Sequence, residues 1–309
     1  MRLVALLEGW RIFLRSEGYS HKTILNYMMF GGYLVGHLGD VEIADVTTED
    51  LRAWFDTLRT EGNYAPASMY RAWVVMRALF NFTSMEGFTT KRPDHAIRRP
   101  KPKKPDIKPF TKDELRRLVD ATKQTAQART DRRKSFKMRR NISLRNQAIV
   151  LVLIDTGIRA GELVRLTYGD YNQSAGEINV RAFDTGKTRP RTLLLGGRAQ
   201  QGLWKYLADR KPLYPESPLF ASQRRELTYD ALRQMLSELG DRAGVLKVHA
   251  HRFRHSFAYW YLINGGDAFS LQRLLGHSSF KMVDYYIQIA DTDRSRWHVS
   301  RSLADRLGL

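Results

Sequence analysis

The chain has 309 residues, of which 51 are Lys or Arg and 32 are Asp or Glu, and its formal net charge at pH 7 is +19. A folded chain this basic repels itself when alone, so its expected partner is a polyanion such as nucleic acid, with an anionic membrane surface as the competing partner. The absence of cysteine excludes disulfide scaffolds, thiolate metal sites and cysteine nucleophiles and suits a reducing cytoplasm, and the length suggests about two domains.

The N-terminal stretch does not have the pattern of a signal peptide, because Glu8 and Arg11 interrupt its apolar residues. The longest strongly apolar run, at 148–154, is far shorter than the roughly 20 residues of a membrane helix. We therefore expect a soluble protein.

Residues 1–90 predict a domain of four helices. Apolar residues recur at helical spacing through 3–14, and Ser20 is placed to cap a second helix. Thr47 begins a capping-box pattern that opens a third helix, and Pro66 suits the first turn of a fourth. We interpret the aromatic residues of these helices as core.

Residues 91–109 break this pattern. Five prolines and eight Lys or Arg in this stretch favour an extended, solvated segment with no core of its own. We interpret it as a linker between domains that also follows DNA phosphates, with Lys101, Lys103 and Lys104 as candidate contacts.

Residues 110–309 predict a second domain of mixed character. A helix capped by Thr111 precedes a polar, basic loop at 123–140. The loop contributes further candidate DNA contacts, namely Arg132, Arg133, Lys134, Arg139 and Arg140. An apolar helix, two strands, five more helices and a polar tail follow, at 142–156, 177–183, 191–195, 198–209, 228–240, 251–264, 268–276, 279–290 and 291–309. The expected fold class is mainly α with a small β-sheet.

Nucleotide and metal chemistry have no support in this sequence. No glycine-rich stretch matches a nucleotide-binding loop. His251 and His255 are spaced as two metal ligands on a helix would be, but Arg252 and Arg254 beside them oppose a dication. We therefore expect no cofactor and no metal.

What remains is an ordered set of cationic, imidazole and phenolic side chains. In chain order the set is Arg159, Lys187, His251, Arg254, His277 and Tyr286. Two of its members, His251 and Arg254, are three residues apart, so they share a helix face. Guanidiniums bind phosphate oxygens with fork geometry, and a tyrosine can attack phosphorus to form a covalent intermediate.

This order resembles the tyrosine site-specific recombinases of the phage integrase family. TGIRAGEL resembles the family's first arginine box, HRFRHSFA its H-x-x-R-H box and LLGHSSF its L-G-H-S-S box. Tyr286 lies nine residues after His277, which is the family's usual interval to the nucleophile. GYSHKTILNYMMF is similar to the S-x-x-T-x-x-x-Y pattern of the family's core-binding domain, so the resemblance covers nearly the whole chain.

The resemblance implies a helical core-binding domain followed by a mixed α/β catalytic domain. It implies that Arg159 and Arg254 bind the scissile phosphate. It also implies that Tyr286, rather than Tyr285, is the nucleophile. Lys187 would be the hairpin lysine and Glu162 an acidic residue that supports the site.

Three features depart from the family's usual pattern. Phe253 and Gln288 stand where the family often has Leu and His, and the hairpin is longer than usual before Lys187. The longer hairpin affects the assignment of Lys187 more than that of any other site residue.

The resemblance also implies partners: double-stranded recombination sites, with a monomer when free and a homotetramer on synapsed DNA. We therefore expect a cytoplasmic, DNA-associated protein with no membrane partner. A type IB topoisomerase that relaxes supercoils and a binding-only DNA protein with the same fold are the alternative functions. The tail at 291–309 has two alternatives, a helix folded back on its own domain or a segment that docks on a neighbouring protomer.

Overall fold

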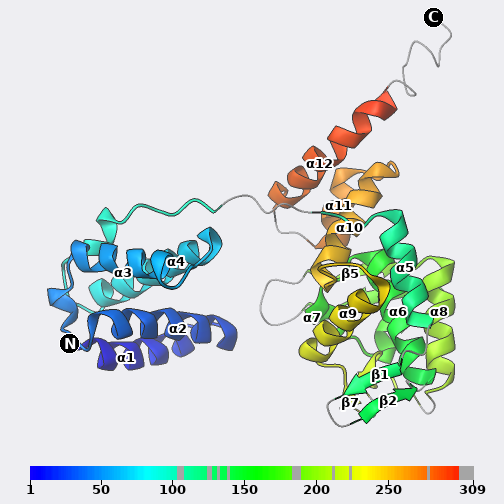
Figure 1. Cartoon of the computed structure of the whole chain (residues 1–309), viewed down its shortest axis with the longest axis horizontal. Helices are drawn as coiled ribbons and strands as arrows, with labels where there is room; N and C mark the ends of the chain where they lie inside the picture. The colour runs from blue at the N-terminus through cyan, green and yellow to red at the C-terminus, as the bar shows by residue number, and fades with distance from the viewer. Residues whose placement is uncertain are drawn as a thin grey trace, which may run out of the picture. The chain divides into compact units, whose positions relative to one another are not determined.

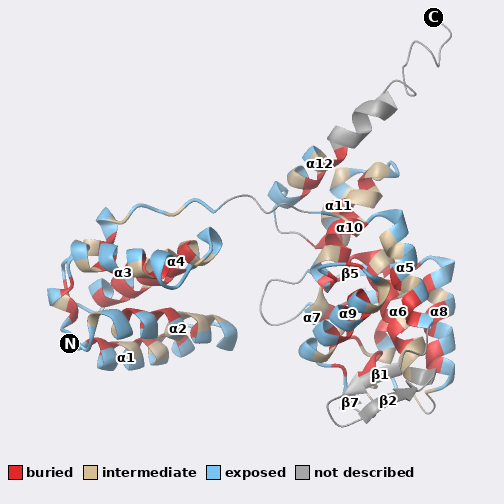
Figure 2. Ribbon diagram, in the orientation of Figure 1, coloured by how far each residue is buried: buried red, intermediate tan, exposed pale blue. Residues whose placement is uncertain are grey.

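A computed structural model describes residues 1–102, 108–123, 127–130, 133–137, 140–182, 189–210, 213–222, 225–276 and 279–298, with side chains left undescribed at 127–141, 225 and 291–298. The chain divides into two compact units, 1–106 and 107–309, each with its own buried core (Figures 1 and 2). The fold is mainly helical with a small β-sheet, as the sequence predicts. Within the described residues, no helix is long and apolar enough to cross a membrane.

The first unit contains the four predicted helices: α1 (Leu3–Ser16), α2 (His21–Leu38), α3 (Thr48–Thr60) and α4 (Pro66–Met85). The predicted caps are present, since the Ser20 hydroxyl accepts the Thr23 N–H and Thr47 forms a capping box. The apolar faces of these helices meet in one core around Trp10 and Trp54. Two short 3-10 turns, η1 (Ile43–Asp45) and η2 (Pro93–Ala96), complete the unit.

The segment predicted as a solvated linker is in part packed on this unit. Asp94 is 0% exposed and pairs with Arg77 and Arg92, both at 2.9 Å. The Trp73 indole donates to the Ile97 carbonyl at 3.1 Å. The proline and charge content of 91–109 indicates an extended segment, but a buried carboxylate bonded to two arginines fixes its first part on the helices.

In the second unit, α6 (Arg140–Thr156) is the apolar helix at the centre of the core. It packs against α5 (Lys112–Lys123), α8 (Gly197–Ala208) and α10 (Ala250–Ile263). The apolar run at 148–154 lies on this helix, as predicted, and most of its residues are buried. The described 127–130 and 133–137 form a hairpin, β1 (Gln127–Thr130) and β2 (Arg133–Lys137), where the charge content indicated a loop.

The strands near the site form an antiparallel sheet in the order β3 (Tyr171–Asn172), β4 (Glu177–Val180) and β5 (Arg191–Leu194). Short elements fill the connections, namely α7 (Ala160–Leu163), η3 (Tyr168–Asp170), β6 (Ala221–Ser222) and β7 (Arg225–Glu226). The remaining helices are α9 (Tyr229–Ala243), α11 (Ala268–Leu275) and α12 (Lys281–His298).

Helices α10, α11 and α12 share a small apolar cluster that is distinct from the main core. Helix α12 continues without a break through 291–298, so the first part of the predicted tail extends the helix that carries Tyr286 (Figure 1). Residues 299–309 lie outside the described part of the chain.

The buried Asp94 gives a prediction about the first unit. Asp94→Asn removes the charge shared by Arg77 and Arg92, and we expect it to destabilise the unit by about 2 kcal/mol. Amide hydrogen exchange at 91–99 should accelerate accordingly. Glu8→Gln breaks an exposed pair with Arg11 and should change neither quantity; equal effects of the two variants would contradict this interpretation.

Candidate active site

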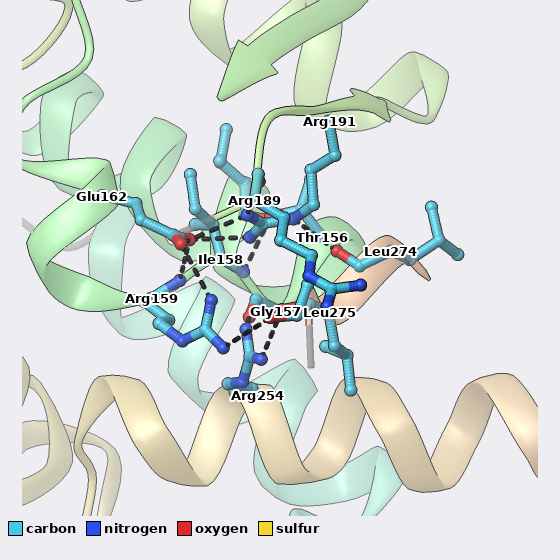
Figure 3. A network of polar contacts seen from close by, with 12 residues as sticks. Thr156, Gly157, Ile158, Arg159, Glu162, Arg189, Arg191, Arg254, Leu274 and Leu275 are labelled. Atoms are coloured by element: carbon cyan, nitrogen blue, oxygen red, sulfur yellow. Dashed lines mark hydrogen bonds and ion pairs between the residues drawn. The ribbon is translucent and has the colours of Figure 1, made fainter. Parts of the chain in front are cut away.

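Three arginines from different elements converge on the C-terminal end of α11 (Figure 3). Arg159 precedes α7, Arg191 begins β5 and Arg254 lies on α10. Each donates to one carbonyl of three consecutive residues: Arg191 Nε to Leu274 (2.6 Å), Arg254 Nη2 to Leu275 (2.6 Å) and Arg159 Nη2 to Gly276 (3.0 Å). The helix end therefore fixes the orientation of three cations that are far apart in sequence.

This contact satisfies a structural need of α11. The last carbonyls of any helix have no partner within the helix. Gly276 adopts a left-handed conformation with φ 62°, and its N–H caps the carbonyls of Gln272 and Arg273. The next carbonyls are those bound by the arginines, whose positive charge also suits the negative end of the helix dipole.

Glu162 holds two of these arginines from the opposite side. Its side chain is 3% exposed and pairs with Arg159 Nη1 at 2.9 Å and with Arg191 Nη2 at 2.7 Å. It also accepts the backbone N–H of Arg159 at 3.0 Å, as the third residue of a helix does in a capping box. Burial opposes ionisation, but the bonds from Arg191 and Arg159 outweigh it and hold the pKa of Glu162 below its ordinary value.

Arg254 is the most buried of the three arginines, at 2% exposed. Its second bond runs from Nη1 to the Gly157 carbonyl at 3.0 Å. Gly157 has φ 57°, and a Cβ there would lie 2.8 Å from Phe257, which explains a glycine at this turn. Burial first, and then the nearby Arg159, lower the pKa of Arg254 to about 9, so the guanidinium keeps its charge at neutral pH.

His251 lies at the exposed start of α10, on the wall of a cavity of about 420 Å³ that Arg159 and Arg254 also line. Burial of the ring and then the charge of Arg254 lower the pKa of His251. The neighbouring His249 caps α10, because its Nδ1 accepts the Arg252 N–H at 3.1 Å. A neutral His251 beside two guanidiniums is suited to proton exchange at a bound anion.

Tyr286 lies on α12 and is 1% exposed, while Tyr285 beside it is less buried. The Tyr286 hydroxyl and His255 Nδ1 are hydrogen-bonded at 2.6 Å. Burial raises the pKa of Tyr286 to about 12, although the nearby Arg254 acts to lower it. The expected nucleophile is therefore next to the arginines but sheltered and protonated.

The structure brings together Arg159, Glu162, His251 and Arg254, with Tyr286 beside them. Other predicted residues lie outside the described part of the chain, namely Lys187, His277, Lys103, Lys104, Arg132 and Arg139. The side chains of Arg133, Lys134 and Arg140 are also undescribed, and Lys101 is exposed.

Sequence reasoning missed two residues of this site. Arg191 occurs at the start of a predicted strand, and nothing in its spacing links it to Glu162 or to a carbonyl on α11. The spacing of His255 from His251 suggests only a metal ligand, although His255 directly follows Arg254. Within the described residues, no three His, Asp or Glu side chains gather as metal ligands would.

Comparison with protein families agrees with this arrangement. The model of the phage integrase family matches residues 108–293. The chain belongs to the phage integrase family. The model of the phage integrase N-terminal SAM-like domain matches residues 6–85, within the first unit.

Characterised relatives cover most of the chain. Tyrosine recombinases XerD and XerC of Oceanobacillus iheyensis are 29% and 30% identical over 92% of this chain, and over 93% and 83% of their own lengths. XerA of Pyrococcus furiosus is 29% identical, over 92% of this chain and 89% of its own.

Two solved structures support the fold. A lambda integrase dimer bound to a COC' core site has a TM-score of 0.72 at 23% identity, covering 91% of this chain and 97% of that one. The Tn1549 transposon integrase in complex with a circular intermediate DNA has a TM-score of 0.76 at 18% identity, covering 98% and 100%. The resemblance found in the sequence is confirmed. This family member is a site-specific tyrosine recombinase, an enzyme that cleaves and rejoins DNA. The alternative functions, a type IB topoisomerase and a binding-only DNA protein, are not favoured.

Removing the charge of Glu162 should destabilise the catalytic unit. Glu162→Gln leaves Arg159 and Arg191 without their shared carboxylate, and we expect a loss of about 3 kcal/mol in the free energy of unfolding at pH 7, measured in urea. The pKa of Glu162 is lowered on folding, so its stabilisation is present above the ordinary value of 4.5 and is lost as the pH falls through the lowered pKa. The difference between the two proteins should therefore narrow in acid. Glu49→Gln, in an exposed pair with Arg52, is the control; a difference for Glu162→Gln that stays constant down to pH 3 would contradict this assignment.

The chain offers a matched pair of glycines to test the end of α11. Gly276 and Gly244 end α11 and α9 with nearly equal left-handed angles, φ 62° and 61°. Alanine at either position should cost about 1 kcal/mol of stability. A Cβ at Gly276 would also lie 3.2 Å from Arg191 Nη1, so only Gly276→Ala should lower DNA cleavage, by about tenfold or more. Equal cleavage rates for the two variants would show that the helix end does not orient the arginines.

Proposed function

We propose that this recombinase cuts DNA recombination sites through a covalent 3′-phosphotyrosine at Tyr286, with Arg159 and Arg254 binding the scissile phosphate. The observation that carries the proposal is the cluster of oriented arginines beside a buried tyrosine. A guanidinium has five N–H donors. The hydrogen bonds to carbonyls and to Glu162 leave donors on both arginines for the two non-bridging oxygens of a phosphodiester.

The arginines stabilise the negative charge that develops on the phosphate in the transition state. Because their guanidiniums are already held by carbonyls and Glu162, little reorganisation is needed when the phosphate arrives. Arg191 does not bind the phosphate in this proposal. It keeps Glu162 ionised and in place, and so acts through Arg159.

The chemical step exchanges one ester bond for another. The Tyr286 oxygen forms a bond to phosphorus, and its proton passes to a histidine of the site, His251 or His277. The bond from phosphorus to the 5′ oxygen breaks, and Lys187 supplies the proton to that leaving oxygen. Rejoining reverses these transfers. The phosphotyrosine keeps the ester-bond energy, so the proposed cycle needs neither ATP nor a metal.

The first unit offers a basic groove as a second contact with the duplex. Arg52, Arg59, Arg98 and Arg99 line a groove of about 480 Å³. Lys101 follows them on the packed segment and is exposed. We infer that this surface neutralises phosphates without reading the sequence, as Lys and Arg contacts to the DNA backbone do.

For assembly we propose a monomer in solution and a homotetramer on synapsed sites, acting in the cytoplasm. A solved lambda integrase tetramer is bound to a Holliday junction, and it shares this fold at a TM-score of 0.69. Helix α12 carries Tyr286 and runs into the C-terminal tail. Docking of this tail on a neighbour would let assembly position the nucleophile, whereas a tail folded back on its own unit would be passive.

A nicked suicide substrate tests the nucleophile. Tyr286→Phe should abolish the covalent protein–DNA adduct, because no hydroxyl remains to attack phosphorus, and Tyr285→Phe should retain it. Adjacent helix residues point about 100° apart, so only one of the two faces the phosphate. An adduct that survives in Tyr286→Phe and disappears in Tyr285→Phe would reverse the assignment. Strand-exchange products from paired sites distinguish recombination from simple relaxation.

A further inference from the structure

We propose that His255 is a positioning residue that holds the Tyr286 hydroxyl in a buried resting position. The inference rests on the proposed role of Tyr286 as the nucleophile. The decisive contact is the 2.6 Å hydrogen bond between His255 Nδ1 and the tyrosine hydroxyl. Both side chains are buried, at 8% and 1% exposed, so water does not compete strongly for this bond.

The His255 ring packs against two other rings. It contacts the ring of His251, with centroids 4.1 Å apart in an edge-to-face arrangement. It also contacts the ring of Tyr286, with a centroid distance of 5.6 Å. His255 therefore stands between a residue exposed at the cavity and the sheltered tyrosine, with its Nδ1 aimed at the hydroxyl.

The sheltered position is unsuited to attack on a phosphate. A side chain that is 1% exposed cannot contact a duplex on the surface without moving. Burial also favours the protonated phenol. Tyr286 must therefore leave His255 before it can react. The strength of this hydrogen bond sets the fraction of molecules in which the tyrosine is released.

The surrounding packing allows such a movement. Tyr286 belongs to the small cluster formed by α10, α11 and α12 rather than to the main core. A shift of α12 would disturb this small cluster, where Val283, Tyr286 and Ala290 are buried, without disturbing the main core. The bond to His255 is a specific restraint on such a shift. In a lone monomer this restraint keeps the nucleophile from the DNA, and assembly that moves α12 releases it.

Chemical protection of the tyrosine tests the proposal without DNA. The full-length protein is treated with N-acetylimidazole, which acetylates accessible tyrosines, and the rate at each tyrosine is read by tandem mass spectrometry. Exposed Tyr19 and Tyr229 serve as internal references. The native protein should protect Tyr286, and His255→Leu should raise its relative rate about tenfold, because a buried hydroxyl without a partner favours the exposed position.

A matched pair of amides makes the test specific for the hydrogen bond. His255→Asn places an amide group where Nδ1 stood and should keep Tyr286 protected, whereas His255→Gln places it farther out and should lose protection. Circular dichroism shows whether each variant folds. If His255→Leu does not fold, the comparison of His255→Asn with His255→Gln still tests the hydrogen bond.

Wild-type protection in folded His255→Leu and His255→Gln would overturn the proposal, as would an equal loss of protection in His255→Asn. Because no DNA is present, such a failure leaves the identity of the nucleophile to the adduct experiment with Tyr286→Phe.

Discussion

The bonds between three arginines and the last carbonyls of α11 set the geometry on which the site depends. Arg159, Arg191 and Arg254 would repel one another if brought together alone. Glu162 supplies the opposing charge on one side, and the negative end of α11 supplies it on the other. The fold thus stabilises a dense positive cluster before any phosphate is present, and the phosphate finds its donors already oriented.

Helix α10 connects this cluster to the tyrosine. Within five residues it carries His251 at the cavity, Arg254 at the arginine cluster and His255 at Tyr286. Helix α11 ends at the same arginines, and α12, which carries Tyr286, follows it along the chain. A change in how α12 sits on α10 therefore alters the tyrosine directly, while the main core around α6 is left intact.

The sequence predicted the helices and the fold class, because apolar periodicity and local caps act within a few residues. It also named Arg159, Arg254 and Tyr286, which lie close together in the structure, whereas Lys187 and His277 lie outside the described residues. Its failures concern contacts between distant residues. The charge content of 91–109 and 123–140 could not reveal that Asp94 would be buried or that a hairpin would form. Arg191 joins the site through a carbonyl 83 residues away, and His255 through a hydroxyl 31 residues away. The composition of the residues around Arg191 and His255 does not indicate such distant partners.

In this structure the arginines are oriented before DNA binds. Arginine-selective ¹⁵N NMR of the DNA-free protein measures this directly, with each signal assigned by an Arg→Lys substitution. We expect Arg159, Arg191 and Arg254 to give separate Nη signals with slow rotation of the guanidinium, unlike the exposed Arg233. Addition of a DNA half-site should change these signals little. Signals that average as those of Arg233 do, and become restrained only when DNA is added, would contradict it.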